Sequence, residues 1–280
     1  MKIAYLGPET TFTHKAALEL FGTQHKFRSA KTIADVFYLV RDRQSDHGVI
    51  PIENSNAGTV SEALNIFCRE DYKLKITNEL FLKIDFHLLS QARKISGIKL
   101  IYAHEMAIKQ CDKWLARNAK NKKIEKVESN AQAAKLACEN QNTAAISNTL
   151  SAQKYNLEIL KKNITDYDDS TTRFLVLSKI NTKPTNNDKT SLLFSLKHKP
   201  GALYHFLAPL AKNNINFIKI ESRIMRIPVR NKTNWEYHFF LDIEGHYKDK
   251  KIQEAICEMK THCLKLKILG SYPRGKTPWG

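Results

Sequence analysis

Apolar residues in the first quarter of the chain alternate between short continuous runs and longer stretches with helical spacing. The short runs 2–7 and 47–54 predict buried strands, because each is bounded by turn residues. Helical spacing is found in three stretches, 13–22, 32–42 and 58–71. Thr13 is a possible N-cap for the first of these helices. Strands that alternate with helices predict a mainly parallel α/β sheet.

The loops after the two predicted strands are ligand candidates by position. In such sheets, ligands bind outside the carboxyl ends of the strands. The loop 7–14 (GPETTFTH) follows the first strand, and the loop 53–58 (ENSNAG) follows the second.

The same alternation continues through the middle of the chain. Extended runs occur at 73–90, 99–104, 123–129 and 143–148, and helical stretches separate the later ones. We therefore expect an α/β domain over residues 1–180 with two lobes. Lobe one is expected to contain about 1–73 plus 160–180, and lobe two about 74–159.

The last third of the chain has a different pattern. A polar linker rich in Pro and Asn is predicted at 181–188. Residues 189–273 predict the order strand, helix, strand, strand, helix, strand, which is the ferredoxin-like arrangement. Residues 274–280 are expected to form a tail.

The chain is basic, with a formal net charge of +17. Residues 1–180 contain 27 Lys and Arg against 20 Asp and Glu, and residues 181–280 contain 18 against 8. The densest basic cluster, 120–126, has acidic interruptions and no interleaved aromatic residues of the kind that stack on bases. We therefore expect no nucleic-acid partner, and a basic surface that favours a small anionic substrate.

Other classes of protein are also disfavoured. No apolar run approaches the ~20 residues of a membrane span, and the N-terminus lacks a signal-peptide core. We expect a cytoplasmic protein with no membrane partner. The five cysteines are scattered without zinc-binding spacing, so no metal and no cofactor is expected.

The segment 166–179 (DYDDSTTRFLVLSK) places polar residues directly before a buried strand. Asp166, Asp168 and Asp169 are typical turn and capping residues. Thr172 and Arg173 follow at the beginning of the apolar run. This position indicates either the end of a turn or a strand end that faces a ligand.

Three stretches together resemble the prephenate dehydratase family. The segment from Tyr155 to Leu177, with the pattern Y-x-L-x-x-L-(x5)-D-(x5)-TRF-L-x-L, resembles the family signature. Residues 48–60 (GVIPIENSNAGTV) resemble its other active-site loop. Residues 201–207 (GALYHFL) and 220–223 (IESR) resemble the regulatory ACT domain that follows the catalytic domain and binds phenylalanine.

The resemblance implies a fold and a set of partners. It implies a two-lobed catalytic domain similar to periplasmic-binding-protein type II folds, followed by a ferredoxin-like ACT domain. No segment similar to chorismate mutase precedes Met1, so a monofunctional enzyme is expected. The implied partners are the substrate prephenate, L-phenylalanine as allosteric effector, and further copies of the chain in a homodimer or homotetramer.

The implied reaction converts prephenate to phenylpyruvate. Loss of carbon dioxide sends electrons through the ring and expels hydroxide, and the gain of aromaticity drives the step. The enzyme must supply a hydrogen-bond donor for the departing hydroxyl, and must hold a dianion in a partly desolvated cleft. No cofactor is required.

The resemblance also assigns roles to individual residues. Thr172 matches the essential threonine, and a neutral hydroxyl can donate to the leaving oxygen without repelling the substrate. Glu53 is the second catalytic candidate, either as an acid whose pKa burial would raise or as a residue that orients the loop. Arg173 has a fork suited to a carboxylate, but it can equally face outward in a salt bridge. The full substrate-binding set is Thr11, Asn54, Ser55, Gly58, Thr59, Gln110 and Arg173. Gly58 and Thr59 are expected to open a helix whose amides suit an anion.

The effector residues implied by the resemblance lie in the last third of the chain. They are Gly201, Ala202, Leu203, Glu221 and Ser222. Several positions depart from the family pattern, namely Thr10, Ala103, Ser170, Ile218 and Ile224. Arogenate dehydration and a non-catalytic amino-acid sensor stay open as alternative functions.

Overall fold

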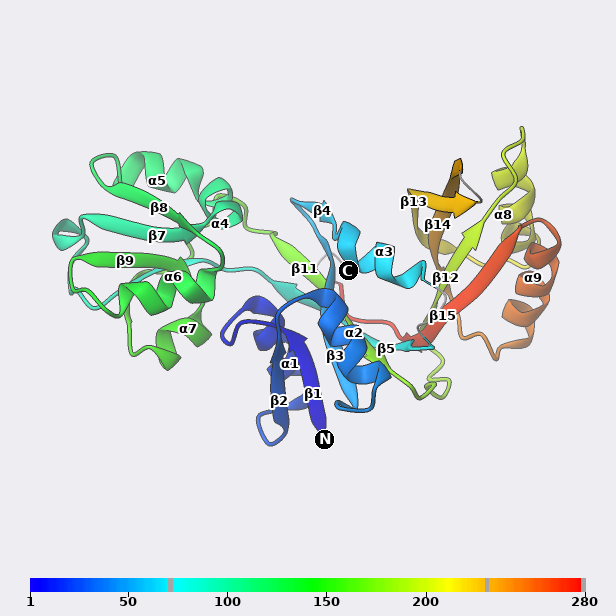
Figure 1. Ribbon diagram of the computed structural model, residues 1–280, viewed down its shortest axis with the longest axis horizontal. Helices are drawn as coiled ribbons and strands as arrows, with labels where there is room; N and C mark the ends of the chain where they lie inside the picture. The colour runs from blue at the N-terminus through cyan, green and yellow to red at the C-terminus, as the bar shows by residue number, and fades with distance from the viewer. Residues whose placement is uncertain (70–72, 230–231, 278–280) are drawn as a thin grey trace.

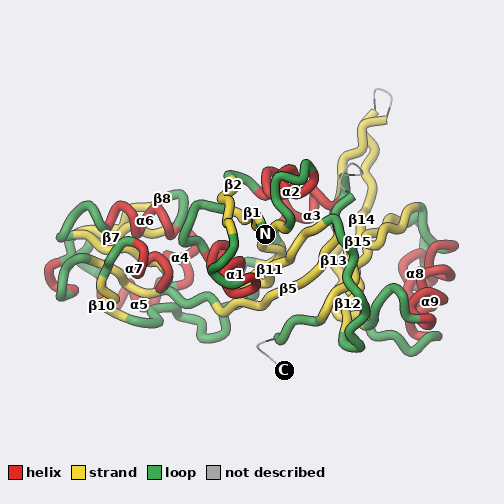
Figure 2. Tube along the Cα trace, turned by 90° about the horizontal axis from the view of Figure 1, so that it is seen from below, coloured by secondary structure: helices red, strands yellow, loops and turns green. Residues whose placement is uncertain are grey.

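The computed structural model describes residues 1–69, 73–229 and 232–277, which form three sheets arranged in a row (Figures 1 and 2). We call them the first, second and third sheets in chain order. The first sheet lies in the middle, the second on one side and the third on the other.

The first sheet has the order β2-β1-β3-β11-β5, with β4 paired to β3. Its strands are β1 (Lys2–Leu6), β2 (Lys26–Ala30), β3 (His47–Asn54), β4 (Gly58–Thr59), β5 (Lys75–Lys83) and β11 (Thr171–Ser178). Strands β2, β1 and β3 are parallel, whereas β11 is antiparallel to both β3 and β5. The α/β class is as predicted, but the sheet is mixed rather than mainly parallel.

Helices α1 (Phe12–Phe21), α2 (Ile33–Arg41) and α3 (Ser61–Phe67) pack on the first sheet. The N-cap of the α1 helix lies two residues before the predicted cap at Thr13. Its N-cap is Thr11, whose hydroxyl oxygen accepts a hydrogen bond from the His14 amide at 3.3 Å. Thr13 is instead buried on the inner face of the helix.

The second sheet has the order β10-β6-β9-β7-β8. Its strands are β6 (His87–Ser90), β7 (Leu100–His104), β8 (Lys123–Val127), β9 (Thr143–Ser147) and β10 (Glu158–Lys161). Its helices are the short 3₁₀ helix Ile95–Gly97, α4 (Glu105–Gln110), α5 (Asp112–Asn118), α6 (Asn130–Ala137) and α7 (Thr149–Lys154). Alanines on the inner face of α6 pack closely on the sheet, which explains why this helix has a weakly apolar sequence.

The chain leaves the first sheet for the second sheet about ten residues later than predicted. Residues 75–83 were expected in lobe two, but β5 pairs with β11 along its whole length in the first sheet. Residues 158–161 form β10 in the second sheet, so the return crossing comes after Lys161. The alternating pattern of 73–90 indicates extended strands, but it carries no information about the sheet in which each strand pairs.

The third sheet has the order β13-β14-β12-β15, and every neighbouring pair is antiparallel. Its elements follow the predicted order: β12 (Asp188–Ser195), α8 (Ala202–Lys212), β13 (Phe217–Val229), β14 (Lys232–Glu244), α9 (Lys250–Thr261) and β15 (Lys265–Pro273). Both helices cover one face, where Phe194 and Phe206 stack with their ring centroids 3.8 Å apart. Figure 1 shows α8 and α9 on the outer side of the sheet, with α3 near its inner side.

The inner face of the third sheet shares a core with the first sheet. Leu193, Phe240, Leu269 and Tyr272 belong to the same buried cluster as side chains from α2, α3, β3 and β11. Strand β15 crosses β5 closely at Gly270, where a Cβ atom would lie 2.1 Å from the Ile76 carbonyl oxygen. Only glycine fits this approach, so Gly270 sets the distance between the two sheets.

Within the described residues, no helix has both the length and the apolar character needed to cross a membrane.

Candidate active site

Three chain segments meet at one edge of the first sheet because of its topology. Strands β1 and β3 run in the same direction, so the loops after Leu6 and Asn54 leave the sheet at the same edge. Strand β11 runs in the opposite direction, and therefore its first residues, Thr171 and Thr172, lie at this edge too. The structure thus brings the segments of Thr11, Asn54 and Thr172 to one place, although 161 positions separate Thr11 from Thr172.

Thr172 is held by a hydrogen bond that fixes the direction of its hydroxyl group. The side-chain amide of Asn54 donates to Thr172 Oγ1 at 2.9 Å. Asn54 is itself oriented, because its Oδ1 accepts from the amides of Asn56 and Ala57 at 3.0 and 2.8 Å. A threonine hydroxyl has one proton to donate besides its acceptor lone pairs. Since Asn54 uses an acceptor position, the Thr172 proton stays available for a ligand.

Ser55 fastens the loop after β3 to the beginning of β11. Its backbone amide donates to the Thr171 carbonyl at 2.9 Å, and its hydroxyl oxygen accepts from the Thr171 amide at 3.0 Å. These two bonds extend the β3–β11 pairing by one residue. The backbone on both sides of Thr172 is therefore fixed before any ligand binds.

Glu53 and Arg173 lie on the opposite face of the strands. Cross-strand partners share a face and successive residues alternate, and the register pairs Arg173 with Glu53 and Thr172 with Asn54. Glu53 Oε2 lies 2.7 Å from Lys219 Nζ of β13, and the Glu53 side chain is 36 % exposed. The predicted catalytic role of Glu53 as a buried acid is therefore not supported by its placement, which favours the alternative of a structural role.

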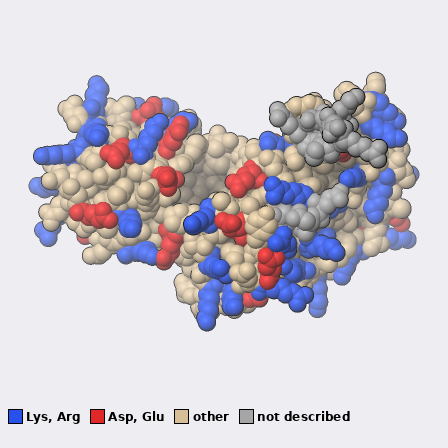
Figure 3. All heavy atoms as spheres, viewed as in Figure 1, with Lys and Arg blue, Asp and Glu red and all other residues tan. Residues whose placement is uncertain are grey.

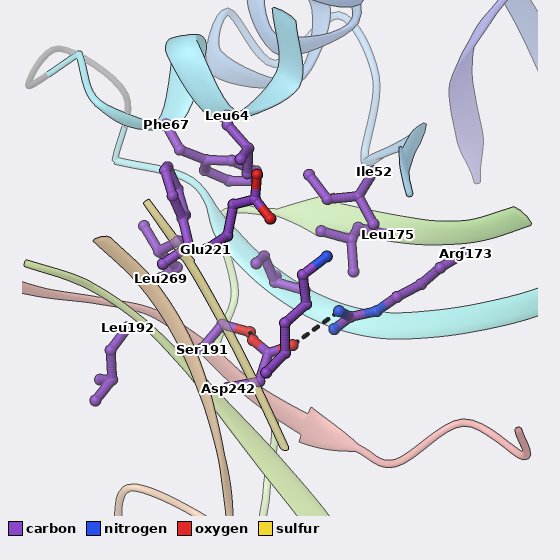
Figure 4. A pocket seen from close by; sticks show the side chains of 13 residues that line it. Ile52, Leu64, Phe67, Arg173, Leu175, Ser191, Leu192, Glu221, Asp242 and Leu269 are labelled. Carbon is purple, nitrogen blue, oxygen red and sulfur yellow. Dashed lines mark hydrogen bonds and ion pairs between the residues drawn. The ribbon is translucent and has the colours of Figure 1, made fainter. Parts of the chain in front are cut away.

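The guanidinium of Arg173 is enclosed in a buried ion network between the first and third sheets (Figure 4). Its Nε lies 2.7 Å from Glu79, one terminal nitrogen lies 2.7 Å from Asp242, and the other donates to the Tyr272 hydroxyl at 3.0 Å. Lys189 completes the network at 2.9 Å from Glu79. Arg173 thus forms a structural salt bridge, but the bridge is buried rather than outward, and a contact of Arg173 with substrate stays a prediction.

The network has the electrostatics of a paired buried site. Burial raises the pKa of the Asp242 carboxyl, but the nearby charges of Arg173 and Lys189 outweigh burial and lower that pKa overall. Burial works against the charge of Arg173, yet Asp242 and Glu79 hold the pKa of the guanidinium above its ordinary value. Both partners are therefore charged, and each depends on the other to be stable in a buried position.

Gly58 and Thr59 do not open a helix. They form the two-residue strand β4, which pairs with Glu53 and Asn54, and α3 begins only at Ser61. Gly58 has a φ of 76°, a left-handed conformation that glycine adopts without strain. The two residues therefore shape a tight hairpin beside Asn54, and the prediction of an anion site at a helix start is wrong.

Gln110 and Asp166 lie where the chain returns from the second sheet to the first. Gln110 is buried, and its Oε1 accepts from the Ser170 hydroxyl at 3.2 Å. The Asp166 carboxylate accepts from the amides of Lys113 and Trp114 at 2.7 and 3.2 Å, which caps α5 as a turn residue was expected to do. Gln110 therefore reaches the segment just before Thr172 from the second sheet.

A second contact between the lobes was missed by sequence reasoning. Asn148 donates to the Thr10 carbonyl at 2.8 Å, and the Ser151 hydroxyl donates to Thr10 Oγ1 at 3.0 Å. All three residues are fully buried, and Thr10 has a φ of 69°. The N-cap position of Asn148 before α7 was readable from the sequence, but its partner 138 residues away was not.

A groove of ≈ 580 Å³ lies between the first and second sheets beside the first loop. Its walls carry Gly7, Pro8, Glu9 and Lys31 on one side and Ser129, Gln132, Lys135 and Lys154 on the other. Lys154 forms an ion pair with Glu9 across the groove. Figure 3 shows the surface hollowed between the second sheet, on the left of the view, and the first. Glu128 also lines the groove, so three lysines stand against two glutamates, and the polar walls with this small excess of positive charge suit a small anion.

Within one chain, the residues predicted to bind the effector lie at separate places on the third sheet. Ala202 and Leu203, which follow Gly201 at the start of α8, line a pocket of ≈ 730 Å³ together with Trp235 and Tyr237. Glu221 instead lines a cavity of ≈ 30 Å³ between the first and third sheets, where its carboxylate points toward Leu64 and Phe67 (Figure 4). Ser222 pairs with Phe239 on the helix-covered side of the sheet.

The first and second sheets form two α/β lobes, and the chain crosses between them twice. A polar groove lies between the lobes, and an oriented hydroxyl lies at a strand end. These features define an enzyme with its site in a cleft, to which the third sheet is attached. The family model described as "Prephenate dehydratase" matches residues 3–182. The chain belongs to the prephenate dehydratase family, and so it is a carbon–oxygen lyase.

Three known proteins are similar to this chain over almost its whole length. The bifunctional chorismate mutase/prephenate dehydratase of Aquifex aeolicus is 43 % identical over 98 % of the chain and 74 % of that protein. The solved prephenate dehydratase of Arthrobacter aurescens, a complex with L-Phe, is 29 % identical with a TM-score of 0.87, covering 98 % of this chain and 90 % of that one. A structure described as a novel type of quorum-quenching acylase is 25 % identical with a TM-score of 0.84, covering 100 % and 99 %.

The monofunctional form stays a prediction, because the relative from Aquifex aeolicus is bifunctional.

Proposed function

We propose that this chain converts prephenate to phenylpyruvate in the cleft between the first and second sheets, with Thr172 as the residue that acts on the leaving hydroxyl. The observation that carries the proposal is the bond from Asn54 to Thr172 Oγ1, which leaves the threonine proton directed to a ligand. The match of the family to residues 3–182, which include every part of this edge, supports the same assignment.

The reaction balances without a cofactor. The bond from the ring carbon to its carboxylate breaks and releases carbon dioxide. The electron pair of that bond moves through the ring and expels the hydroxyl on the opposite carbon. Thr172 donates its hydrogen bond to this oxygen as negative charge develops there, and the oxygen leaves as water after taking a proton. The aromatic ring of phenylpyruvate remains.

The other residues at this edge bind and position the substrate. The Ser55 hydroxyl accepts from the Thr171 amide and keeps its proton, so it can donate to a substrate carboxylate. The Asn54 amide and the Thr11 hydroxyl donate within the protein, to Thr172 and to the Leu6 carbonyl, and they position this edge. Gln110 buttresses Ser170 from the second sheet. Lysines of the neighbouring groove raise the local concentration of a dianion by electrostatic attraction. Glu53 and Arg173 act on the other face by holding β3 and β11 against the third sheet.

The test is the appearance of phenylpyruvate, measured by its absorbance in base, when the purified chain is mixed with prephenate. Arogenate is run in parallel, and its product is phenylalanine. Turnover of prephenate is expected. An absence of turnover on both compounds, from folded protein, contradicts the proposal and favours the non-catalytic sensor.

We also propose that residues 189–273 form an ACT domain through which L-phenylalanine inhibits the enzyme. The solved relative from Arthrobacter aurescens was obtained in complex with L-Phe. Gly201 has a φ of 77° before α8, so the chain turns sharply there and exposes the first amides of the helix. The pocket beside it contains exposed apolar side chains, among them Leu203 and Trp235, that suit an aromatic ring.

A homodimer or homotetramer is part of this proposal. Strand β13 lies at the edge of the third sheet, and proteins rarely leave a long edge strand open. Exposed apolar residues gather in this region, namely Leu203, Tyr204, Ile224, Trp235, Tyr237 and Leu264. A second copy placed on this region would cover them.

Calorimetric binding of phenylalanine, activity with added phenylalanine and light scattering test the regulatory proposal. Gly201→Val is expected to weaken binding and inhibition while uninhibited activity survives, because a β-branched residue is strained at this φ. Binding of phenylalanine without any effect on the enzymatic rate would show that the third sheet stabilises the protein but does not regulate it. A monomer at micromolar concentration, with or without phenylalanine, would contradict the oligomer.

A further inference from the structure

The hairpin that carries Asn54 extends from the first sheet with an exposed tip. It comprises residues 53–59, in which the end of β3 pairs with β4, and residues 55–58 at its tip are exposed. Segments with few buried contacts open locally at low free-energy cost. Ser55 ties the tip to β11, and Glu53 ties the base to the third sheet. The position of the hairpin therefore depends on a few specific contacts.

Two side chains at the base of the hairpin lie on opposite faces of the strand. Asn54 lies on the face of Thr172, and its amide donates to Thr172 Oγ1 at 2.9 Å. Glu53 lies on the face of the third sheet, because successive residues of a strand alternate. The two residues are adjacent in the chain, so a rotation of the strand that moves the Glu53 side chain also moves that of Asn54. The contacts of Glu53 thus affect the direction of the bond to Thr172.

Lys219 of β13 holds Glu53 from the third sheet. Its Nζ lies 2.7 Å from Glu53 Oε2, whereas a terminal nitrogen of Arg173 lies 3.9 Å from the same oxygen. Arg173 has two closer carboxylates, those of Glu79 and Asp242, each at 2.7 Å. Among the residues that the structure describes, Lys219 is therefore the principal cation for Glu53.

The third sheet fixes the side on which Lys219 lies. The register pairs Lys219 with Asp242 of β14, whose carboxylate contacts Arg173, and directly opposite residues share a face. All three residues line the small cavity of ≈ 30 Å³ between the first and third sheets. Only 24 % of the Lys219 side chain is exposed, so solvent and salt screen its ion pair with Glu53 less than a surface pair.

We propose that Lys219 is a positioning residue for the reaction in the cleft. It holds Glu53 and thereby keeps Asn54 in the direction that orients the Thr172 hydroxyl. The assignment rests on the proposed role of Thr172. Lys219 acts from the opposite face of the strands and does not touch the reacting atoms. The third sheet therefore contributes a residue to the geometry of the active edge, in addition to its proposed role in binding an effector.

Hydrogen exchange of the full chain without ligand, followed by mass spectrometry, tests the anchoring without any need for turnover. Lys219→Met keeps an unbranched side chain and removes the charge. Amide exchange in residues 53–60 is expected to become roughly twofold to fivefold faster, the range expected for the loss of a partly exposed ion pair. Lys219→Arg, which restores a cation, is expected to return the exchange rate toward that of the wild type.

The matched control for the exchange experiment is Lys212→Met. It breaks the exposed ion pair of Lys212 with Glu258, which joins α8 to α9 on the outer side of the third sheet. Exchange in residues 53–60 is expected to stay unchanged in this variant. Unchanged exchange in Lys219→Met, or the same acceleration in both variants, overturns the proposal.

The rate of phenylpyruvate formation tests the consequence for catalysis. The kcat/KM of Lys219→Met is expected to fall roughly fivefold to twentyfold, because a displacement of about 1 Å at a catalytic group can cost about 10²-fold. Lys219→Arg is expected to recover most of this loss, and Lys212→Met is expected to keep the wild-type value. A loss in Lys219→Met that Lys219→Arg does not recover would overturn the role of the charge.

A double-mutant cycle tests whether Lys219 acts through Glu53. Glu53→Gln is expected to lower kcat/KM about as much as Lys219→Met, and the double variant is expected to lose little more than either single variant. Additive losses would show that the two residues act independently. A much deeper loss in Glu53→Gln alone would make Glu53 an acid that acts on the substrate. Either result overturns the proposal.

The two readouts separate this proposal from the proposed function. A wild-type chain that does not turn over prephenate contradicts the proposed function, and the exchange experiment still decides whether Lys219 holds the hairpin. An active wild type together with a normal kcat/KM in Lys219→Met overturns the positioning role of Lys219 and leaves the proposed function standing.

Discussion

The first sheet has two interfaces, and they are built from opposite chemistry. Its contact with the second sheet includes hydrogen bonds between neutral groups, such as the Asn148 side chain to the Thr10 carbonyl and Ser170 to Gln110, beside the exposed ion pair of Lys154 with Glu9. Its contact with the third sheet is a continuous apolar core with the charged network of Arg173, Glu79, Lys189 and Asp242 at its centre.

This difference in interface chemistry indicates which parts of the molecule can move relative to one another. Neutral hydrogen bonds can be exchanged for bonds to water at modest cost, so the two lobes can open to admit substrate. A shared apolar core with buried charges cannot be separated without exposing both. The first and third sheets therefore behave as one body. Neighbouring residues of β11 belong to the two sides, since Thr172 faces the cleft and Arg173 faces the core.

The largest expected effect comes from breaking the charged interface. Asp242→Ala removes the carboxylate 2.7 Å from Arg173 and leaves two buried cations, Arg173 and Lys189, facing the single buried carboxylate of Glu79. We expect a loss of about 3–5 kcal/mol in the free energy of unfolding, measured by urea titration. Lys212→Ala is the control, because it removes one partner of an exposed ion pair and should cost at most about 1 kcal/mol. Equal losses of unfolding free energy in the two variants would show that the buried network does not stabilise this interface.

A smaller effect is expected at the neutral interface. Asn148→Ala removes the donor to the Thr10 carbonyl and the cap of α7. We expect about 1–3 kcal/mol of lost stability and a reduced kcat/KM, because the first loop carries Thr11. Thr32→Ala, which removes the cap of α2 away from the cleft, should lose about 1 kcal/mol and keep its kcat/KM. A normal kcat/KM in Asn148→Ala would show that this contact does not contribute to catalysis.

The smallest effect concerns pH at the first loop. The Thr10 amide donates to His14 Nδ1 at 3.1 Å, and the His14 ring stacks on Tyr5. Burial lowers the pKa of His14 below its ordinary 6.5, although Glu9 raises it. Since the unfolded chain then binds the proton more readily, the contribution of His14 to stability is present above pH 6.5 and is lost as the pH falls through its folded pKa.

We therefore expect kcat/KM to fall as the pH drops through the folded pKa of His14, which lies below 6.5, because protonation breaks the bond to Thr10. Burial also lowers the pKa of four other histidines, so overall stability falls in the same window; they are His47, His87, His104 and His238. His14→Gln isolates the loop, because it removes the titration at this position alone. An unchanged pH profile of kcat/KM in this variant would exclude His14 as the cause.

Most of the fold was predictable because local patterns determine it. The apolar runs of β1, β3 and β11 and the element order of the third sheet follow from period and turn residues. The sheet membership of β5 did not follow, because an alternating strand fits any sheet that offers an apolar face. Gly270 carries no signal of its role either, since the Ile76 backbone that approaches it is 194 positions away in the sequence.

The candidate site was predictable only at the level of segments. The motifs located Asn54, Ser55 and Thr172, which the structure brings to one edge. They did not show that Thr172 and Arg173 have different roles on opposite faces of β11, because the role of each face depends on what packs against it. The charged partners of Arg173, Glu79 and Asp242, belong to distant strands, and no local pattern indicates them.

The measurement that tests the account most directly is the rate of phenylpyruvate formation by Thr172→Val at saturating prephenate. Valine keeps the shape of threonine and removes the hydroxyl that Asn54 orients. We predict that kcat falls at least roughly 10²-fold, the scale of one preorganised donor, with a modest change in KM and an unchanged free energy of unfolding. A Thr172→Val enzyme with a near-normal kcat would contradict the assignment of Thr172 and, with it, the division of β11 into a catalytic and a structural face.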